Sequence, residues 1–148
     1  MIKRLILFTL LNFGALALGG LFTPGGISSD WYQSINKAPW TPPGWVFGFA
    51  WTSIMICLSI YMALSLKEKE DNLVKLYVLQ LLLNVIWTPV FFYFHQKVFG
   101  LVIISLLAAL IAFLIKMDPN KRIALLLIPY FLWLLIATSL NFYIVIYN

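Results

Sequence analysis

Residues 98–115 read VFGLVIISLLAALIAFLI and lie between Lys97 and Lys116 without a charged side chain. An α-helix rises about 1.5 Å per residue, so this stretch nearly matches the roughly 30 Å of a bilayer's hydrocarbon core. Lipid offers the backbone no hydrogen-bond partner, so a segment that crosses it must be helical. The stretch therefore predicts a transmembrane helix, which we place at 98–116.

The remaining charged residues divide the rest of the chain in the same way. We expect the first apolar run to be a retained helix, because it is longer than the apolar region of a signal peptide. The sequence predicts an all-α membrane protein, a single domain over 1–148. We expect a bundle of five transmembrane helices with a long structured loop between the first two, and spans at approximately 5–24, 43–66, 73–95, 98–116 and 123–146.

The composition supports a lipid environment and excludes several functions. Hydrophobic residues make up 63% of the chain, charged residues 10%, and the mean hydropathy is +0.96, whereas soluble domains carry about 25% charged residues. The net charge of +5 is scattered in ones and twos, so we expect no nucleic-acid partner. One cysteine and one histidine cannot build a metal site. No charged pair lies within a span, so we expect no ordinary catalytic residues.

The segment 23–42 has the composition of a structured loop, with aromatic residues, glycines and three prolines. Ser28-Ser29-Asp30 before Trp31 is typical of a helix N-cap and predicts a short helix over about 30–36.

The basic residues predict the orientation in a bacterial-type cell membrane. If the N-terminus is inside, the long loop and the C-terminus are outside, and the outer side carries only Lys37 and Lys97. Cytoplasmic loops are enriched in lysine and arginine. The inner side then collects eight basic residues: Lys3, Arg4, Lys67, Lys69, Lys75, Lys116, Lys121 and Arg122.

Three spans carry aromatic and polar side chains at helical spacing, which places each set on one helix face. In the second span the set is Gly44, Gly48, Trp51, Met55 and Ser59. In the third it is Tyr77, Gln80, Asn84, Trp87, Thr88, Phe91 and His95. In the fifth it is Tyr130, Trp133, Ala137 and Asn141, with Thr138 beside them.

These faces allow two interpretations. Indoles and amides that converge in the outer half of the bundle would suit a flat, largely apolar ring system. Interior Asn, Gln and Thr also join helices without any ligand, and tryptophans commonly form interfacial belts. The spacing alone leaves both open.

Three runs of sequence resemble those of the TspO/MBR family (translocator protein and tryptophan-rich sensory protein). The first is Trp31-Tyr32 followed by KAPWTPPGWVFG (37–48) and Trp51-Thr52. The second is NVIWTPVFF (84–92), and the third is PYFLW (129–133) followed by Ala137, Thr138 and Asn141. They occur in the expected order and spans.

The resemblance implies five helices, a homodimer and a cavity beneath the first loop, with no resident cofactor. The cavity would bind a porphyrin such as protoporphyrin IX or haem, and in mitochondrial members, of the outer membrane, cholesterol or synthetic drug ligands. Carried over residue by residue, the pocket would comprise Tyr32, Pro42, Pro43, Trp51, Asn84, Trp87, Thr88, Phe91, Trp133, Ala137 and Asn141.

Our leading hypothesis is a porphyrin-binding membrane protein that acts in stress sensing, sequestration or transport. One alternative is a light-dependent porphyrin-degrading enzyme, in which the resemblance implicates Trp51 and Trp133. Another is a structural or regulatory membrane partner whose tryptophans only pack. Small residues four apart (Ala15 and Gly19, Gly44 and Gly48) allow close helix approach and support the expected homodimer.

Overall fold

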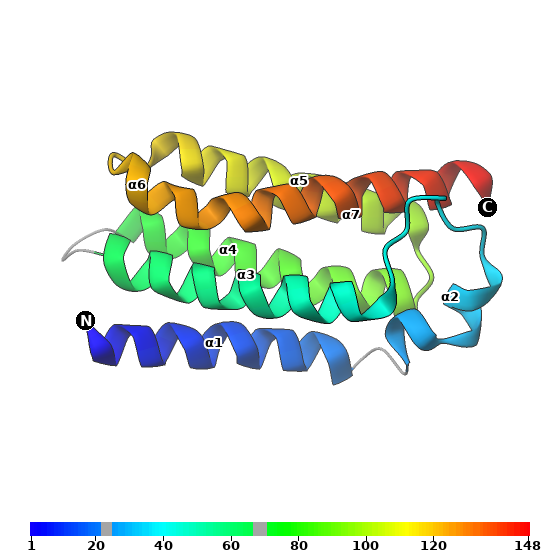
Figure 1. Cartoon of the computed structure of the whole chain (residues 1–148), viewed down its shortest axis with the longest axis horizontal. Helices are drawn as coiled ribbons and strands as arrows, with labels where there is room; N and C mark the ends of the chain where they lie inside the picture. Colours follow the sequence, from blue (N-terminus) through cyan, green and yellow to red (C-terminus); the bar gives the residue numbers. More distant parts are fainter. Residues whose placement is uncertain (22–24, 67–70) are drawn as a thin grey trace.

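The computed structural model describes residues 1–21, 25–66 and 71–148, and every regular element in them is helical. Short helices extend two of the long ones: η2 (Pro89–Tyr93) continues α4, while α6 (Lys121–Ala124) and η3 (Leu125–Leu127) precede α7. The predicted all-α membrane fold is confirmed, since five helices are long and apolar enough to cross a bilayer. They are α1 (Ile2–Leu21), α3 (Gly44–Ser65), α4 (Asp71–Thr88), α5 (Lys97–Met117) and α7 (Ile128–Tyr147), shown in Figure 1.

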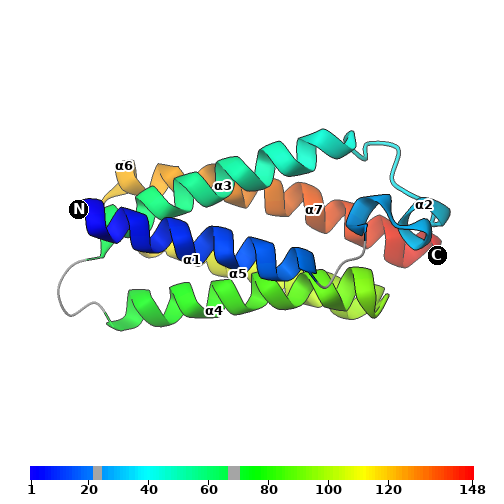
Figure 2. The same cartoon turned by 90° about the horizontal axis from the view of Figure 1, so that it is seen from below.

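The five long helices form a closed ring in the order α1, α3, α7, α5, α4, in which each packs against its two neighbours. Figures 1 and 2 show α1 lying across α3 and α4 on one side of the bundle, with α5 and α7 on the other. Apolar side chains fill the interior, and large apolar side chains also cover the outward faces. Such an outer surface suits lipid, so the chain is an integral multi-pass membrane protein.

The long loop folds over the end of the bundle that carries the C-terminus (Figure 1). It contains η1 (Gly26–Ser28) and α2 (Asp30–Ser34). The predicted N-cap is confirmed, because the Ser29 hydroxyl accepts a hydrogen bond from the Tyr32 backbone N–H at 3.2 Å. Gly25, at φ 78°, supplies the left-handed backbone that starts η1, which costs glycine little.

One small residue of α1 allows a close approach within the protomer. Gly19 is buried, and a Cβ added there would lie 3.2 Å from Thr88 Oγ1 on α4. This glycine therefore serves the packing of α1 on α4 inside one chain. Gly48 on α3 is different, because an added Cβ would meet nothing within 4 Å.

The basic residues separate between the two ends of the bundle. Lys67 and Lys69 of the predicted inner set lie outside the described residues. The other six stand near the N-terminal end of α1, the start of α4 and the α5–α6 turn. Lys37 belongs to the long loop, and Lys97 begins α5, where its Nζ donates to the carbonyl of the C-terminal Asn148 at 2.7 Å. The long loop and the C-terminus lie at the opposite end of the bundle (Figure 1). This separation supports an inside N-terminus.

The orientation predicts which introduced cysteines a membrane-impermeant maleimide reaches in intact bacterial cells. In a Cys57→Ala background, Ser34→Cys should be labelled from outside, because Ser34 is exposed in the long loop. Asn72→Cys, exposed at the start of α4, should be labelled only after the cells are permeabilised. The reverse pattern would mean that the bundle is inserted the other way.

Candidate ligand-binding site

The end of α4 that lies under the long loop changes its helical geometry at Pro89. Proline has no N–H and its ring crowds the preceding turn, which disturbs α-helical hydrogen bonding. Here the backbone continues as one turn of π-helix, in which the Phe94 N–H donates to the Pro89 carbonyl at 2.9 Å. The wider turn ends at Tyr93 and is followed by His95, a non-glycine residue with φ 55°. Such π-turns are frequent at functional sites.

An aromatic cavity of about 30 Å³ lies beside this turn, under the long loop. The Trp87 and Phe91 rings stack in parallel, with centroids 5.3 Å apart and an interplanar angle of 8°. The Phe92 ring also borders the cavity and lies edge-on to Phe91, with ring centroids 5.0 Å apart. The cavity draws its lining from α2, α3, α4, η2 and α7: Tyr32, Phe47, Trp87, Phe91, Phe92, Ala137, Leu140, Asn141 and Ile144.

Asn141 of α7 lines the cavity, and Thr138 lies three residues before it on the same helix. In one of its two amide orientations, Asn141 accepts from Trp87 Nε1 and donates to the Lys97 carbonyl, both at 3.3 Å. That orientation satisfies both neighbours, so it is the one expected. The buried Thr138 hydroxyl has no hydrogen-bond partner among the described residues.

The long loop that covers the cavity contacts the rest of the protein through aromatic stacking and through hydrogen bonds to the C-terminal residue. Trp31 stacks on His95, with ring centroids 4.2 Å apart and planes 14° apart. The Asn36 N–H donates to Asn148 Oδ1 at 2.8 Å, and Asn148 Nδ2 donates back to the Asn36 carbonyl at 3.0 Å. Burial raises the pKa of the Tyr32 phenol above its ordinary value, so this ring is neutral at physiological pH.

The structure brings five of the residues predicted for the pocket to this cavity: Tyr32, Trp87, Phe91, Ala137 and Asn141. The other six lie outside its lining. Thr88 faces Gly19 of α1, while Pro42 and Pro43 directly precede α3, with Pro43 at its N-cap. Trp133 is 6% exposed and packs edge-on against Phe47 at 5.2 Å.

Trp51 and Asn84 meet at Tyr130, deeper in the bundle. Asn84 Nδ2 donates to Tyr130 Oη at 2.8 Å, and Tyr130 Oη donates to Gln80 Oε1 at 2.9 Å. The Trp51 ring lies edge-on to Tyr130 at 6.1 Å. Gln80 is fully buried, and its Nε2 has no hydrogen-bond partner within the described part of the chain. This cluster lies further along the bundle than the aromatic cavity and is not part of its lining.

A second interior cluster includes a residue that the sequence interpretation missed. Asn12 Nδ2 donates to Ser59 Oγ at 2.9 Å, and Tyr77 Oη donates to Asn12 Oδ1 at 2.8 Å. It joins α1, α3 and α4 and leaves all three polar groups satisfied. Asn12 is an amide within an apolar run, and that signal could have identified it. Four cavity residues were also missed: Phe47, Phe92, Leu140 and Ile144.

The fold and this site define a class: helical multi-pass membrane proteins with an aromatic cavity beneath a long extramembrane loop. The sequence profile of the TspO/MBR family matches residues 6–147, and the chain belongs to that family. The resemblance drawn from the three sequence runs is thereby confirmed.

Similar proteins come from bacteria, archaea and animals. The chain is 36% identical to the tryptophan-rich protein TspO of Archaeoglobus fulgidus, over 90% of each chain. It is 32% identical to protein CrtK of Rhodobacter capsulatus, over 85% of this chain and 81% of that protein. It is 34% identical to the translocator protein of Homo sapiens, over 76% of this chain and 71% of that protein.

Proposed function

We propose that this protein binds a flat, largely apolar tetrapyrrole such as protoporphyrin IX or haem at the aromatic cavity, in stress sensing, sequestration or transport. The observation that carries the proposal is the stacked Trp87–Phe91 pair with Asn141 at its edge. Parallel indole and phenyl rings suit the face of a planar ring system, and one amide can orient its polar edge. Sterols and synthetic drug ligands are further candidates for the same apolar walls.

Binding requires the cavity to open, because about 30 Å³ is far below the roughly 300–1,000 Å³ of ligand pockets. The loop that covers it is attached to α7 by few polar contacts. These include the Asn36–Asn148 pair and a hydrogen bond from Trp40 Nε1 to Ser139 Oγ at 3.1 Å. Each such bond contributes only about 1 kcal/mol net. Lifting the loop from α7 is therefore the low-cost route for admitting a ring.

Titration of protoporphyrin IX into the purified protein in lipid nanodiscs tests the proposal. We expect saturable quenching of tryptophan fluorescence, because Trp87 and Trp31 lie at or above the cavity. Empty nanodiscs correct for partitioning of the porphyrin into lipid. Quenching that rises linearly without saturation would contradict the proposal and favour a structural or regulatory partner without a small-molecule ligand.

Illumination of the porphyrin-loaded protein separates binding from the enzyme alternative. A binding protein should return the porphyrin spectrum unchanged after light exposure. New absorbing products that disappear in Trp51→Phe and Trp133→Phe would favour light-dependent degradation. Both indoles lie outside the lining of the closed cavity, so our expectation is an unchanged spectrum.

We further propose that the protein is a homodimer with the Gly48 face of α3 at its seam. Gly48 is exposed and an added Cβ would meet nothing within its own chain, so the position is open to a second helix. Gly48→Ile should lower the cross-linked dimer fraction severalfold. Gly14→Ile is the matched control, because Gly14 on α1 is equally open. If cross-linking were reduced only by Gly14→Ile, the seam would lie on α1.

A further inference from the structure

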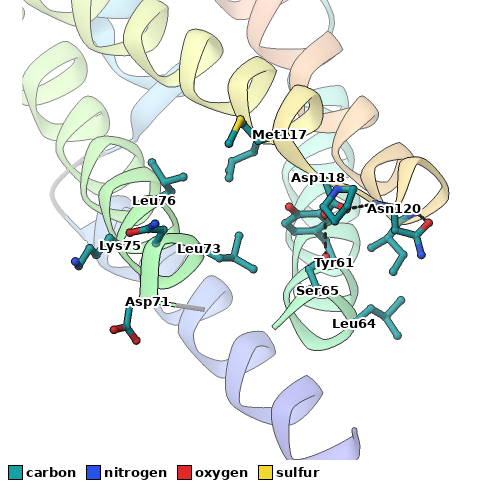
Figure 3. A pocket seen from close by; sticks show the side chains of 14 residues that line it. Tyr61, Leu64, Ser65, Asp71, Leu73, Lys75, Leu76, Met117, Asp118 and Asn120 are labelled. Carbon is teal, nitrogen blue, oxygen red and sulfur yellow. Dashed lines mark hydrogen bonds between the residues drawn. The ribbon is translucent and has the colours of Figure 1, made fainter. Parts of the chain in front are cut away.

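A second and much larger cavity lies at the opposite end of the bundle from the aromatic one. Its volume is about 590 Å³, within the range of small-molecule pockets. It opens between the end of α3, the start of α4 and the turn from α5 to α6 (Figure 3). If the N-terminus is inside, this cavity faces the inner surface of the membrane.

One wall of this cavity holds a buried carboxylate. Asp118 follows α5 and is 8% exposed. Ser65 Oγ donates to its Oδ2 at 3.2 Å, and the Asn120 backbone N–H donates to its Oδ1 at 2.8 Å. A carboxylate offers about four lone-pair positions, so these two bonds leave it with unused acceptor capacity.

No basic side chain of the described residues lies within ion-pairing distance of Asp118. Lys121, three residues away, instead donates to the backbone carbonyls of Lys116 at 2.8 Å and Asp118 at 2.9 Å. Among the residues that the structure describes, the charged groups lining the cavity are Asp118, Asp71 and Lys75. These three described groups are two carboxylates and one ammonium. Burying a carboxylate without a paired charge is costly, so a cationic group bound beside Asp118 would lower that cost.

Apolar side chains line the cavity beside these polar groups. Leu73 and Leu76 of α4 face Tyr61 and Asp118 across the cavity, and Met117 lies at one side (Figure 3). A ligand that fills this space therefore needs an apolar body as well as a cationic head. Simple metal ions lack such a body, and among the described residues no three His, Cys, Asp or Glu side chains group to hold one.

We propose that this cavity binds a primary amine carried on an apolar body, with its ammonium group on the Asp118 carboxylate. An ammonium has three donors and no acceptor, which matches the unused acceptor positions of Asp118. Such an amine could come from a free aromatic or alkyl amine or from the head group of an ethanolamine phospholipid. The site is independent of porphyrin binding at the other end of the bundle.

A series of three ligands with the same phenylbutyl body tests the proposal. The full-length protein in phosphatidylcholine nanodiscs is titrated by calorimetry with 4-phenylbutylamine, 4-phenylbutan-1-ol and 5-phenylpentanoate. Only the amine should bind saturably. Asp118→Asn should weaken it at least about tenfold, because a charge-assisted hydrogen bond is replaced by a neutral one. Asp30→Asn is the matched control, since Asp30 is an exposed carboxylate at the other end. Equal affinity for amine and alcohol would overturn the proposal.

A second variant keeps the test decisive if Asp118→Asn does not fold. Leu76→Trp fills the cavity from the α4 wall and leaves the carboxylate and its two hydrogen bonds in place, so it should also abolish amine binding. Unchanged affinity in this variant would overturn the proposal. Adding phosphatidylethanolamine to the nanodiscs distinguishes a free amine from a phospholipid head group as the natural occupant. A fall in apparent affinity for 4-phenylbutylamine identifies the lipid head group as an occupant, whereas no change identifies free amines.

Discussion

Trp87→Ala is expected to weaken protoporphyrin IX binding by about one order of magnitude. Trp87 forms one wall of the aromatic cavity, stacked on Phe91 at 5.3 Å. Stacking of a base on an aromatic side chain is worth roughly 1–3 kcal/mol, and we apply this scale to an indole against a porphyrin. A loss of about 1.4 kcal/mol is tenfold in Kd. Fluorescence titration in nanodiscs measures it through the five remaining tryptophans.

Two further variants show whether the indole face or its N–H matters. Trp87→Phe keeps an aromatic face but loses the hydrogen bond to Asn141, so its Kd should lie between those of the wild type and Trp87→Ala. Ile86→Ala changes the adjacent residue, which is exposed on the outer surface of the bundle, and should leave the Kd unchanged. An unchanged Kd in a folded Trp87→Ala protein would remove the aromatic cavity from the proposed binding site.

The fold was largely predictable from where charges are absent. Charge-free stretches must be helical in lipid, and each predicted span corresponds to a long helix of the structure. The order of the helices around the ring was not predictable. It depends on contacts such as Gly19 against Thr88, and helical spacing shows which face is buried but not which helix covers it.

The sequence predicts which helix faces point toward the candidate site, but not how far the cavity extends along each helix. Helical spacing places Asn84, Trp87 and Phe91 on one face of the predicted third span, yet only Trp87 and Phe91 reach the cavity. Asn84 lies one turn deeper, where the Tyr130 side chain fills the interior. How far a space extends along a helix depends on the bulk of side chains from other helices, which no single span reveals.

Phe92 shows a second limit of periodicity. In an α-helix, adjacent residues point about 100° apart, so Phe91 and Phe92 would not be expected to line one space. The π-turn at Pro89–Tyr93 changes the spacing, and both rings border the cavity. Proline in the run NVIWTPVFF indicates a disturbed helix, but sequence alone does not distinguish a kink from a π-turn.

Trp133→Ala should have the opposite profile to Trp87→Ala, with a large loss of stability. Trp133 is 6% exposed, belongs to the main core and packs edge-on against Phe47 at 5.2 Å. In soluble proteins, Trp→Ala in a core costs about 3–5 kcal/mol because a cavity remains. Lipid also dissolves indole well, so in a membrane only the lost packing counts. We therefore expect a loss of about 3 kcal/mol, measured by denaturant titration in mixed micelles.

Trp45→Ala is the matched control, since Trp45 lies on α3, which packs beside α7, and is 73% exposed. This variant should change the free energy of unfolding by less than about 0.5 kcal/mol. Trp133→Phe keeps a ring against Phe47 and should recover much of the loss. If Trp133→Ala were no less stable than Trp45→Ala, the indole would not be a packing residue. A weakened porphyrin affinity in that stable variant would instead place Trp133 in the opened binding site. The two tryptophan variants therefore separate the residues that hold the bundle together from those that contact a ligand.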